Sequence, residues 1–299
     1  MPVDTAKDPA GTARDDSIAT LEAGLDALTV TATARRPLGR RIAAVVLPAL
    51  VAFALVVAIW ELLYLARVKP HYLLPSPWTT AKRFGTLFGN GDIPKAMWLS
   101  VSRGMLGFAI SILIGTPLGI LVARVRYVRS AVKPVLSGLQ CLPSVAWVPA
   151  AILWFGLSNS TIYFVVLMGA VPSIAVGMVS GLDQIPPLYV RVGTVMGARG
   201  LRSVYHVLVP AALPGYLGGL RQGWAFAWRS LMAAELITQS PELGTGLGQL
   251  LDKSRETIDA PGAIALIITI LFVGMTIELL VFAPTERAVL RRRGLKPGA

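Results

Sequence analysis

Long stretches without any charged residue are the feature that most constrains this chain. Gly104–Ala123, Pro134–Leu157 and Ser158–Leu182 contain no Asp, Glu, Lys or Arg. A helix needs about 20 apolar residues to cross the hydrocarbon core of a bilayer. Three further apolar runs of similar length carry few or no charges: Ile42–Trp60, which continues to Ala66, Leu217–Ile237 and Gly262–Ala283. The sequence therefore predicts an all-α membrane protein with six transmembrane helices.

Composition excludes several other classes of protein. Of the 299 residues, 54% are hydrophobic and 15% are charged, whereas soluble domains contain about 25% charged residues. The net charge of +12 does not indicate a nucleic-acid surface, because apolar runs separate the charges. A single cysteine, Cys141, prevents an intrachain disulfide, and the distant His71 and His206 do not form a metal-binding pattern. We therefore expect no nucleic-acid partner and no bound metal.

The distribution of Lys and Arg predicts the orientation of the spans. Basic residues gather before the first span, after the second and fourth, and after the sixth: Arg35, Arg36, Arg40, Arg41; Arg124, Arg126, Arg129, Lys133; Arg191, Arg199, Arg202; Arg287, Arg291, Arg292, Arg293, Lys296. By the positive-inside rule these segments, and both termini, are cytoplasmic. A signal peptide is not predicted, because 41 mostly polar residues precede the first apolar run.

The two ends of the chain differ from the membrane domain. Residues 1–41 are predicted to be a largely disordered cytoplasmic tail, residues 42–283 the six-helix domain, and residues 284–299 a basic cytoplasmic tail. Within the first tail, Ile18, Leu21, Leu25 and Leu28 have helical spacing. They form either a short helix that docks on a partner or a transient amphipathic turn.

Residues 183–214, between the fourth and fifth predicted spans, are too long and too apolar for a simple linker. Leu188–Val207 favours helix, Gly197 and Gly200 allow sharp turns, and Pro210 follows. An apolar, helix-forming segment with arginines at its rim suits a hydrophobic groove on a soluble partner. We therefore expect this loop to dock on another subunit.

Part of this loop resembles the EAA signature of ABC importer permeases, which reads EAA, three residues, Gly, nine residues, I-x-L-P. Here Gly197 is followed by nine residues and then Val207-Leu208-Val209-Pro210. The first three letters differ, since Arg191-Val192-Gly193 stands in place of Glu-Ala-Ala. The resemblance implies contact with an ATPase groove, without a salt bridge from that Glu. The residues it implies for coupling to the ATPase are Arg191, Val195, Gly197, Ala198, Arg199, Tyr205 and Pro210.

Six short motifs narrow the resemblance. In order along residues 40–290, they resemble the nitrate/sulfonate/taurine importer permeases and are most similar to the aliphatic-sulfonate permeases. The motifs are Leu74–Pro77, Leu142–Pro149, Ile152–Leu157, Leu208–Pro214, Ala233–Glu235 and Gly244–Gly248.

The resemblance implies a type I ABC importer permease fold with a cytoplasmic coupling helix. It also implies a homodimer in the bacterial inner membrane, two ATP-binding cassette subunits and an extracytoplasmic substrate-binding protein. The chain contains no G-x-x-x-x-G-K-[ST] phosphate loop. We therefore expect no cofactor and no catalysed reaction in this chain, with ATP and Mg²⁺ bound by the partner ATPase subunits.

Arg229 is the first candidate for a contact in the substrate pathway. It lies in the middle of the fifth predicted span, where an ionisable side chain costs about 2.5–3.5 kcal/mol to insert. Its planar guanidinium suits an oxyanion such as a sulfonate. The alternative is an internal ion pair, for which Glu278 of the sixth span is the most available acid.

Three further residues are candidates for the pathway or its gate. Glu235 has a structural or a gating role, and Arg103 is either an anchor that extends to the outer surface or an anion contact there. Trp147 lies between Pro143 and Pro149, which break the helical hydrogen bonds of the third span. It is either a gate residue or part of the packing of a kinked helix.

The predicted function is ATP-driven import of aliphatic sulfonates or a related small anion by alternating access. Alternative cargoes for the same machine are taurine, nitrate, bicarbonate or a heterocyclic nutrient. An ion-coupled secondary transporter would need an inverted repeat and paired carboxylates, and a membrane-embedded enzyme would need a cluster of catalytic side chains. Neither pattern is found in the sequence.

Overall fold

The computed structural model describes residues 38–292, and every regular element in that range is helical. The first helix, α2 (Leu38–Leu65), begins before the predicted span and contains Pro48. The proposed docking set Ile18, Leu21, Leu25 and Leu28 lies outside the described residues.

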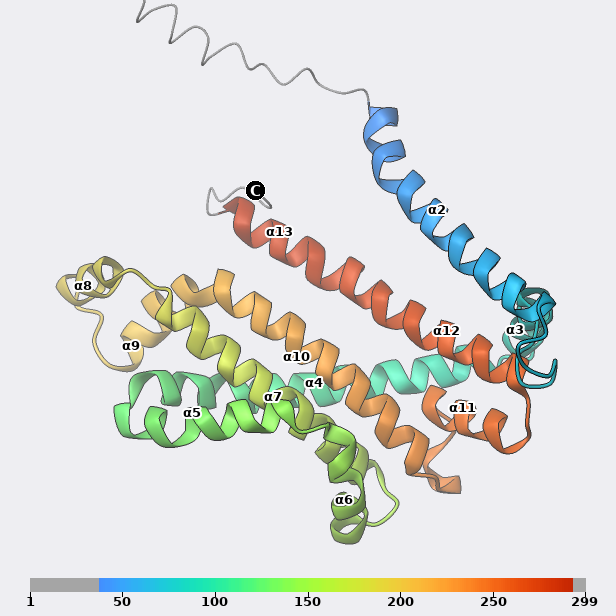
Figure 1. Ribbon diagram of the computed structural model, residues 1–299. Helices are drawn as coiled ribbons and strands as arrows, with labels where there is room; N and C mark the ends of the chain where they lie inside the picture. The colour runs from blue at the N-terminus through green and yellow to red at the C-terminus, as the bar shows by residue number, and fades with distance from the viewer. Residues whose placement is uncertain (1–37, 293–299) are drawn as a thin grey trace, which may run out of the picture. The chain divides into compact units, whose positions relative to one another are not determined.

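Three helices form the centre of the part that begins at Trp60. They are α4 (Asp92–Arg124), α7 (Asn159–Asp183) and α10 (Val209–Ile237). Helix α7 packs against both α4 and α10, and it runs beside α10 in Figure 1. It is the most completely buried of the long apolar helices. The core of this part therefore surrounds α7.

The contact between α7 and α10 is made at backbone distance. A Cβ atom on Gly219 of α10 would overlap the Cα atom of Gly177 of α7. One turn away, a Cβ on Gly181 would lie 2.8 Å from the carbonyl oxygen of Ala212. Helices in membranes associate through such small residues, because lipid chains provide no hydrophobic driving force between them.

Helix α4 contacts α7 through glycines as well. A Cβ on Gly119 would lie 2.6 Å from the carbonyl oxygen of Ala175, and one on Gly115 would lie 3.0 Å from the side chain of Ile174. The glycines that would weaken a soluble helix therefore bring α4 and α7 close together.

The third predicted span is a broken helix, as its prolines led us to expect. Helix α5 (Arg126–Cys141) is followed by a 3₁₀ turn (Ser144–Trp147) and α6 (Val148–Phe155), with a bend of 99° between the two arms. The break falls at Leu142, whose backbone is extended (φ −75°, ψ 124°) because proline follows it. Helix α5 also begins earlier than predicted, so Arg126, Arg129 and Lys133 belong to it and not to a loop.

The remaining helices pack at the ends of the central three. Helix α3 (Pro77–Gly89) packs on α12 (Ala260–Ile277), and Arg83 of α3 donates to Asp259 at 2.7 Å. Asp259 also caps α12 by accepting from the N–H of Gly262 at 3.0 Å. Helix α11 (Leu247–Glu256) lies against α4, α10 and α12, and α12 continues through a π-helical turn (Glu278–Phe282) into α13 (Ala283–Arg292).

Three helical segments in the described part of the chain are long and apolar enough to cross a membrane: α4, α7 and residues 260–291. The bent pair α5–α6 would add a fourth. Helix α10 is not among them, and it carries Arg221, Arg229 and Glu235. The structure thus supports several membrane-spanning helices.

The α7–α10 contact predicts different effects on stability when each of two adjacent glycines is replaced by alanine. Gly219→Ala should lower the free energy of unfolding by about 1–3 kcal/mol, since its methyl group would force α7 and α10 apart. Gly218→Ala is the control, because nothing lies within 4 Å of its added Cβ. That change should be neutral or should stabilise by up to about 1 kcal/mol, as is usual in a helix. Melting temperatures of the purified proteins in detergent test this, and equal shifts would contradict the packing argument.

Candidate functional site

The loop between α7 and α10 is organised around two left-handed glycines. Helix α8 (Pro187–Val195) is followed by a turn, by α9 (Leu201–Ser203) and by a π-helical segment (Val204–Leu208) that runs directly into α10. Gly197 has φ +83° and Gly200 has φ +56°, a region that glycine enters without strain. The chain can therefore reverse after α8 within a few residues.

One side of α8 is packed and the other is bare. A Cβ on Gly193 would lie 2.8 Å from Cγ2 of Val207, so the returning segment packs tightly against α8. On the outer side, Val195, Met196 and Tyr205 are 89%, 81% and 80% exposed. Such an apolar surface on a rigid turn has the composition of a docking site.

The structure places six of the seven predicted coupling residues in this segment. Arg191, Val195, Arg199 and Tyr205 are exposed, Gly197 forms the turn, and the N–H of half-buried Ala198 donates to the carbonyl of Gly193 at 2.8 Å. Pro210 lies separately, in the first turn of α10. The side chains of four of the seven predicted residues are therefore exposed on this segment.

Arg103 and Glu235 form a buried ion pair between α4 and α10. Arg103 Nη1 lies 3.1 Å from Glu235 Oε1, and the two side chains are 4% and 0% exposed. Glu235 Oε2 accepts from Ser100 Oγ at 2.6 Å and from the N–H of Gly248 at 3.1 Å. Both carboxylate oxygens are thus satisfied, as a buried charge requires.

The same cluster holds the loop that precedes α11. Arg103 donates to the carbonyl of Leu243, and the N–H of Leu247 donates to Ser100 Oγ at 2.8 Å. A Cβ on Gly246 would lie 2.5 Å from both carboxylate oxygens of Glu235, so only glycine fits there. We name Ser100, Arg103, Glu235 and the loop 243–248 the outer junction, after the side of the membrane that the positive-inside rule predicts for it.

The outer junction corrects the expectation that Arg103 reaches the outer surface. It also includes Ser100, which the sequence did not identify as a candidate. Arg103 does not extend to the surface, because α4 begins at Asp92 and Glu235 provides an internal partner. Glu235 has the structural environment that was one of its two predicted roles. Ser100 gave no signal in the sequence beyond its position in a helix, since its contacts come from a distant loop.

Arg229 is exposed on α10 and is not paired with Glu278. Its Nε donates to the carbonyl of Ala225 at 3.0 Å, and its guanidinium lies 4.7 Å from the ring centre of Phe226. Glu278 is instead paired with Arg221, about two helical turns from Arg229 on α10. Arg229 borders a hollow of about 770 Å³ between α10 and α12, lined also by Trp224, Trp228, Ile270 and Leu271. Arg229 forms no ion pair with a carboxylate in the described part of the chain.

Trp147 lies at the bend between α5 and α6. Its ring is half-buried and meets Phe164 of α7 edge-on, with 6.1 Å between ring centres. The bend is also tied to α10, because Ser230 Oγ donates to Ser144 Oγ at 2.7 Å. The contact with Phe164 thus explains the buried part of the Trp147 ring, and the rest of the ring is accessible.

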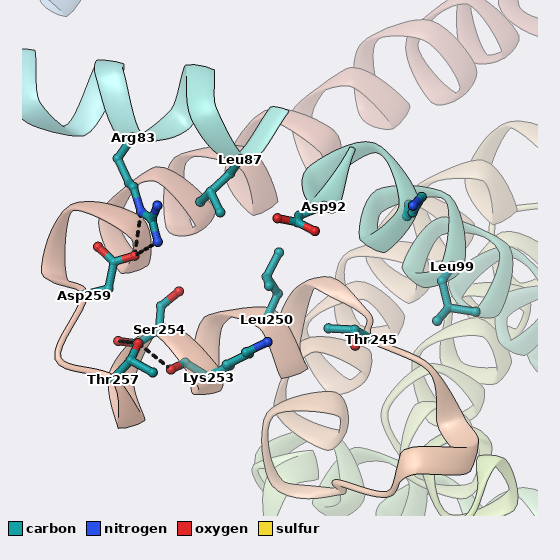
Figure 2. A pocket seen from close by; sticks show the side chains of 11 residues that line it. Arg83, Leu87, Asp92, Leu99, Thr245, Leu250, Lys253, Ser254, Thr257 and Asp259 are labelled. Atoms are coloured by element: carbon teal, nitrogen blue, oxygen red, sulfur yellow. Dashed lines mark hydrogen bonds and ion pairs between the residues drawn. The ribbon is translucent and has the colours of Figure 1, made fainter. Parts of the chain in front are cut away.

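A charged hollow of about 670 Å³ lies between α3, the start of α4 and α11 (Figure 2). Asp92 and Lys253 extend into it from opposite walls, and the Arg83–Asp259 pair closes one end (Figure 2). Lys95 also lines the hollow. Within residues 38–292, no cluster of three His, Cys, Asp or Glu side chains could hold a metal ion.

The outer junction predicts a strong effect of removing one charge. Glu235→Gln should lower the free energy of unfolding by about 3–5 kcal/mol, because it leaves Arg103 buried without a counter-ion. The double variant Arg103→Met/Glu235→Leu should recover much of that loss. Glu242→Gln, an exposed residue of the same loop, should change it by no more than about 0.5 kcal/mol. Melting temperatures in detergent measure all three, and a mild effect of Glu235→Gln would contradict this account of the junction.

Comparisons with known proteins agree with this architecture. Residues 115–284 match the family described as "Binding-protein-dependent transport system inner membrane component". A putative ABC transporter permease of Methanocaldococcus jannaschii is 31% identical over 75% of this chain and 84% of its own length. A putative aliphatic sulfonates transport permease of Bacillus subtilis is 27% identical over 82% of this chain and 87% of its own. Relatives named for taurine transport and nitrate import match over similar lengths.

Among solved structures, the MetNI methionine ABC transporter in an inward-facing conformation contains a chain with the same fold. The TM-score is 0.55 at 19% identity, over 65% of this chain and 94% of that one. The chain therefore belongs to the binding-protein-dependent transport system inner membrane components, as a permease of an ABC importer in the group that includes the taurine, sulfonate and nitrate permeases.

Proposed function

We propose that the chain forms, as a homodimer, the translocation pathway of an importer for aliphatic sulfonates or a related small anion. Two ATP-binding cassette subunits on the cytoplasmic side and an extracytoplasmic substrate-binding protein complete the machine. The observation that carries this proposal is the bare apolar surface of Val195, Met196 and Tyr205, on a loop whose last segment runs directly into α10. Family membership excludes the ion-coupled secondary transporter considered above.

We propose six spans with both termini in the cytoplasm of a bacterium. Helices α2 and α10 and the bent pair α5–α6 join the three apolar segments to make six. The distribution of Lys and Arg supports this orientation, since α8 and α13 then lie on the basic, cytoplasmic side. The hollow in Figure 2 then faces outward, where its charges suit contact with the binding protein.

Helix α10 is the element proposed to carry motion across the membrane. Its first residues continue the π-helical segment of the α8 turn, and near its other end Glu235 is bound into the outer junction. Between these ends its glycines contact α7 at backbone distance. Displacement of the turn by an ATPase would therefore move α10, α7 and the outer junction together.

The α8 surface gives the sharpest test of coupling. Val195→Asp should lower ATP hydrolysis and uptake at least about tenfold, because it buries a charge in the ATPase contact. Folding should not change, since Val195 is 89% exposed. Val68→Asp is the matched control on the predicted outer side, where Val68 is 58% exposed. ATPase and ethanesulfonate-uptake assays on the complete transporter in proteoliposomes measure both; full activity of Val195→Asp would overturn the docking role.

Arg229 provides a test of the cargo. If its guanidinium contacts the anion, Arg229→Gln should lower ethanesulfonate uptake about tenfold or more, the loss of a charged hydrogen bond. ATP hydrolysis stimulated by the loaded binding protein should persist. The same assays with taurine, nitrate, bicarbonate and a heterocyclic nutrient separate the alternative cargoes. Unchanged uptake of every anion in Arg229→Gln would remove Arg229 from the pathway.

A further inference from the structure

Helix α5 is divided lengthwise into three strips. Val128, Val132 and Leu136 form the first strip and pack against Val122 of α4 and Val179 of α7. This apolar contact fixes which sides of α5 face away from the core.

The second strip is polar over the whole helix. Its members follow one another at intervals of four and three residues, the spacing of a single helical face: Arg126, Ser130, Lys133, Ser137 and Gln140. At 1.5 Å per residue this strip is about 21 Å long. We name it the α5 polar strip.

The third strip is exposed and apolar. Tyr127 is 87% exposed, Val135 is 59% exposed, and Ala131 lies between them. Exposed apolar side chains on a membrane helix suit lipid or another membrane helix. The two outward strips of α5 thus face different surroundings.

The length of the polar strip excludes lipid chains as its neighbour. Helix α5 packs along α4 and α7, which cross the bilayer in the proposed arrangement. Each headgroup layer of a bilayer is only about 5–8 Å thick, so a strip of about 21 Å along these helices reaches into the hydrocarbon depth. Polar side chains at that depth face protein or a water-filled cavity. The strip ends at the 99° bend beside Ser144 and Trp147, where the helix is bonded to α10.

The charge along the strip is positive and unmatched. A hollow of about 540 Å³ is lined by Arg126, Arg129, Ser130, Lys133, Pro134 and Ser137, and by no carboxylate. Asp183 binds Arg129 through two hydrogen bonds of 2.9 and 2.6 Å, which neutralises that charge. No carboxylate in the described part of the chain forms an ion pair with Arg126 or Lys133.

We propose that the α5 polar strip lines a water-filled exit on the cytoplasmic side of the pathway, where Arg126 and Lys133 bind small oxyanions. The orientation in this inference rests on the proposed function. Cations and hydroxyls alternate along this face, and both kinds of group bond the oxygens of a sulfonate. Selection of anions at the exit would be a property of α5, separate from any contact at Arg229.

Thiol labelling tests the strip without requiring transport. In a Cys141→Ser background, Ser137→Cys places a thiol on the polar strip and Val135→Cys places one on the apolar strip at nearly the same depth. The complete transporter in inverted membrane vesicles is treated with two membrane-impermeant methanethiosulfonates, one carrying a sulfonate and one a trimethylammonium group. Each rate is divided by the rate of the same reagent with a small free thiol.

The expected result is rapid labelling of Ser137→Cys, with the anionic reagent favoured, and slow labelling of Val135→Cys. Adding Arg126→Gln/Lys133→Gln should lower the anion preference by about threefold or more, as expected for nearby charges in water. Arg124→Gln, a cation outside the hollow, should not change it.

Two results would overturn the inference. Failure of both reagents at Ser137→Cys would place the strip against protein instead of water, and an unchanged preference in Arg126→Gln/Lys133→Gln would remove the anion site. Neither result would touch the proposed function, which the uptake assay tests separately. If the transporter does not take up ethanesulfonate but Ser137→Cys is labelled as expected, the inferred exit stands and the proposed cargo is wrong.

Discussion

The backbone contact between α7 and α10 is the constraint on which the rest of the structure depends. Where Gly177 meets Gly219 there is no room for a single methyl group, so the two helices are held closer than ordinary side chains would allow. This closeness buries α7, and α4 then seats on α7 through its own glycines. Dispersion between tightly packed surfaces is the main attraction available to helices in lipid, which explains why glycines occupy these positions.

Helix α10 joins two parts of the molecule that lie at its opposite ends. One end continues into the turn that presents Val195 and Tyr205, and the other carries Glu235 into the outer junction. A buried ion pair contributes little net stability, but breaking it is costly, so such a pair fixes one arrangement of the elements it joins. The outer junction thus holds the loop before α11 in a defined position relative to α4 and α10.

Much of the fold followed from simple patterns. Uncharged runs located α4 and α7, and Gly197 and Gly200 located the turn after α8, because each depends only on local residue types. A break in the third span was expected from its prolines, but its size was not, because how far Pro143 turns the chain depends on what holds each arm. Arg103 was placed too near the surface because the helix before it extends through less apolar residues, which hydropathy does not detect.

The sequence by itself determined that this chain is an α-helical membrane permease with an apolar loop between its fourth and fifth predicted spans, since hydropathy, charge bias and the order of the motifs depend on local residues. The tertiary structure alone decided which charges are satisfied: it paired Arg103 with Glu235 and Arg221 with Glu278, and left Arg229, Arg126 and Lys133 without carboxylate partners among the described residues. Pairing depends on which helices approach within a few ångströms. Arg103 and Glu235 are more than 100 positions apart, so the residues around each of them do not show that the two will meet.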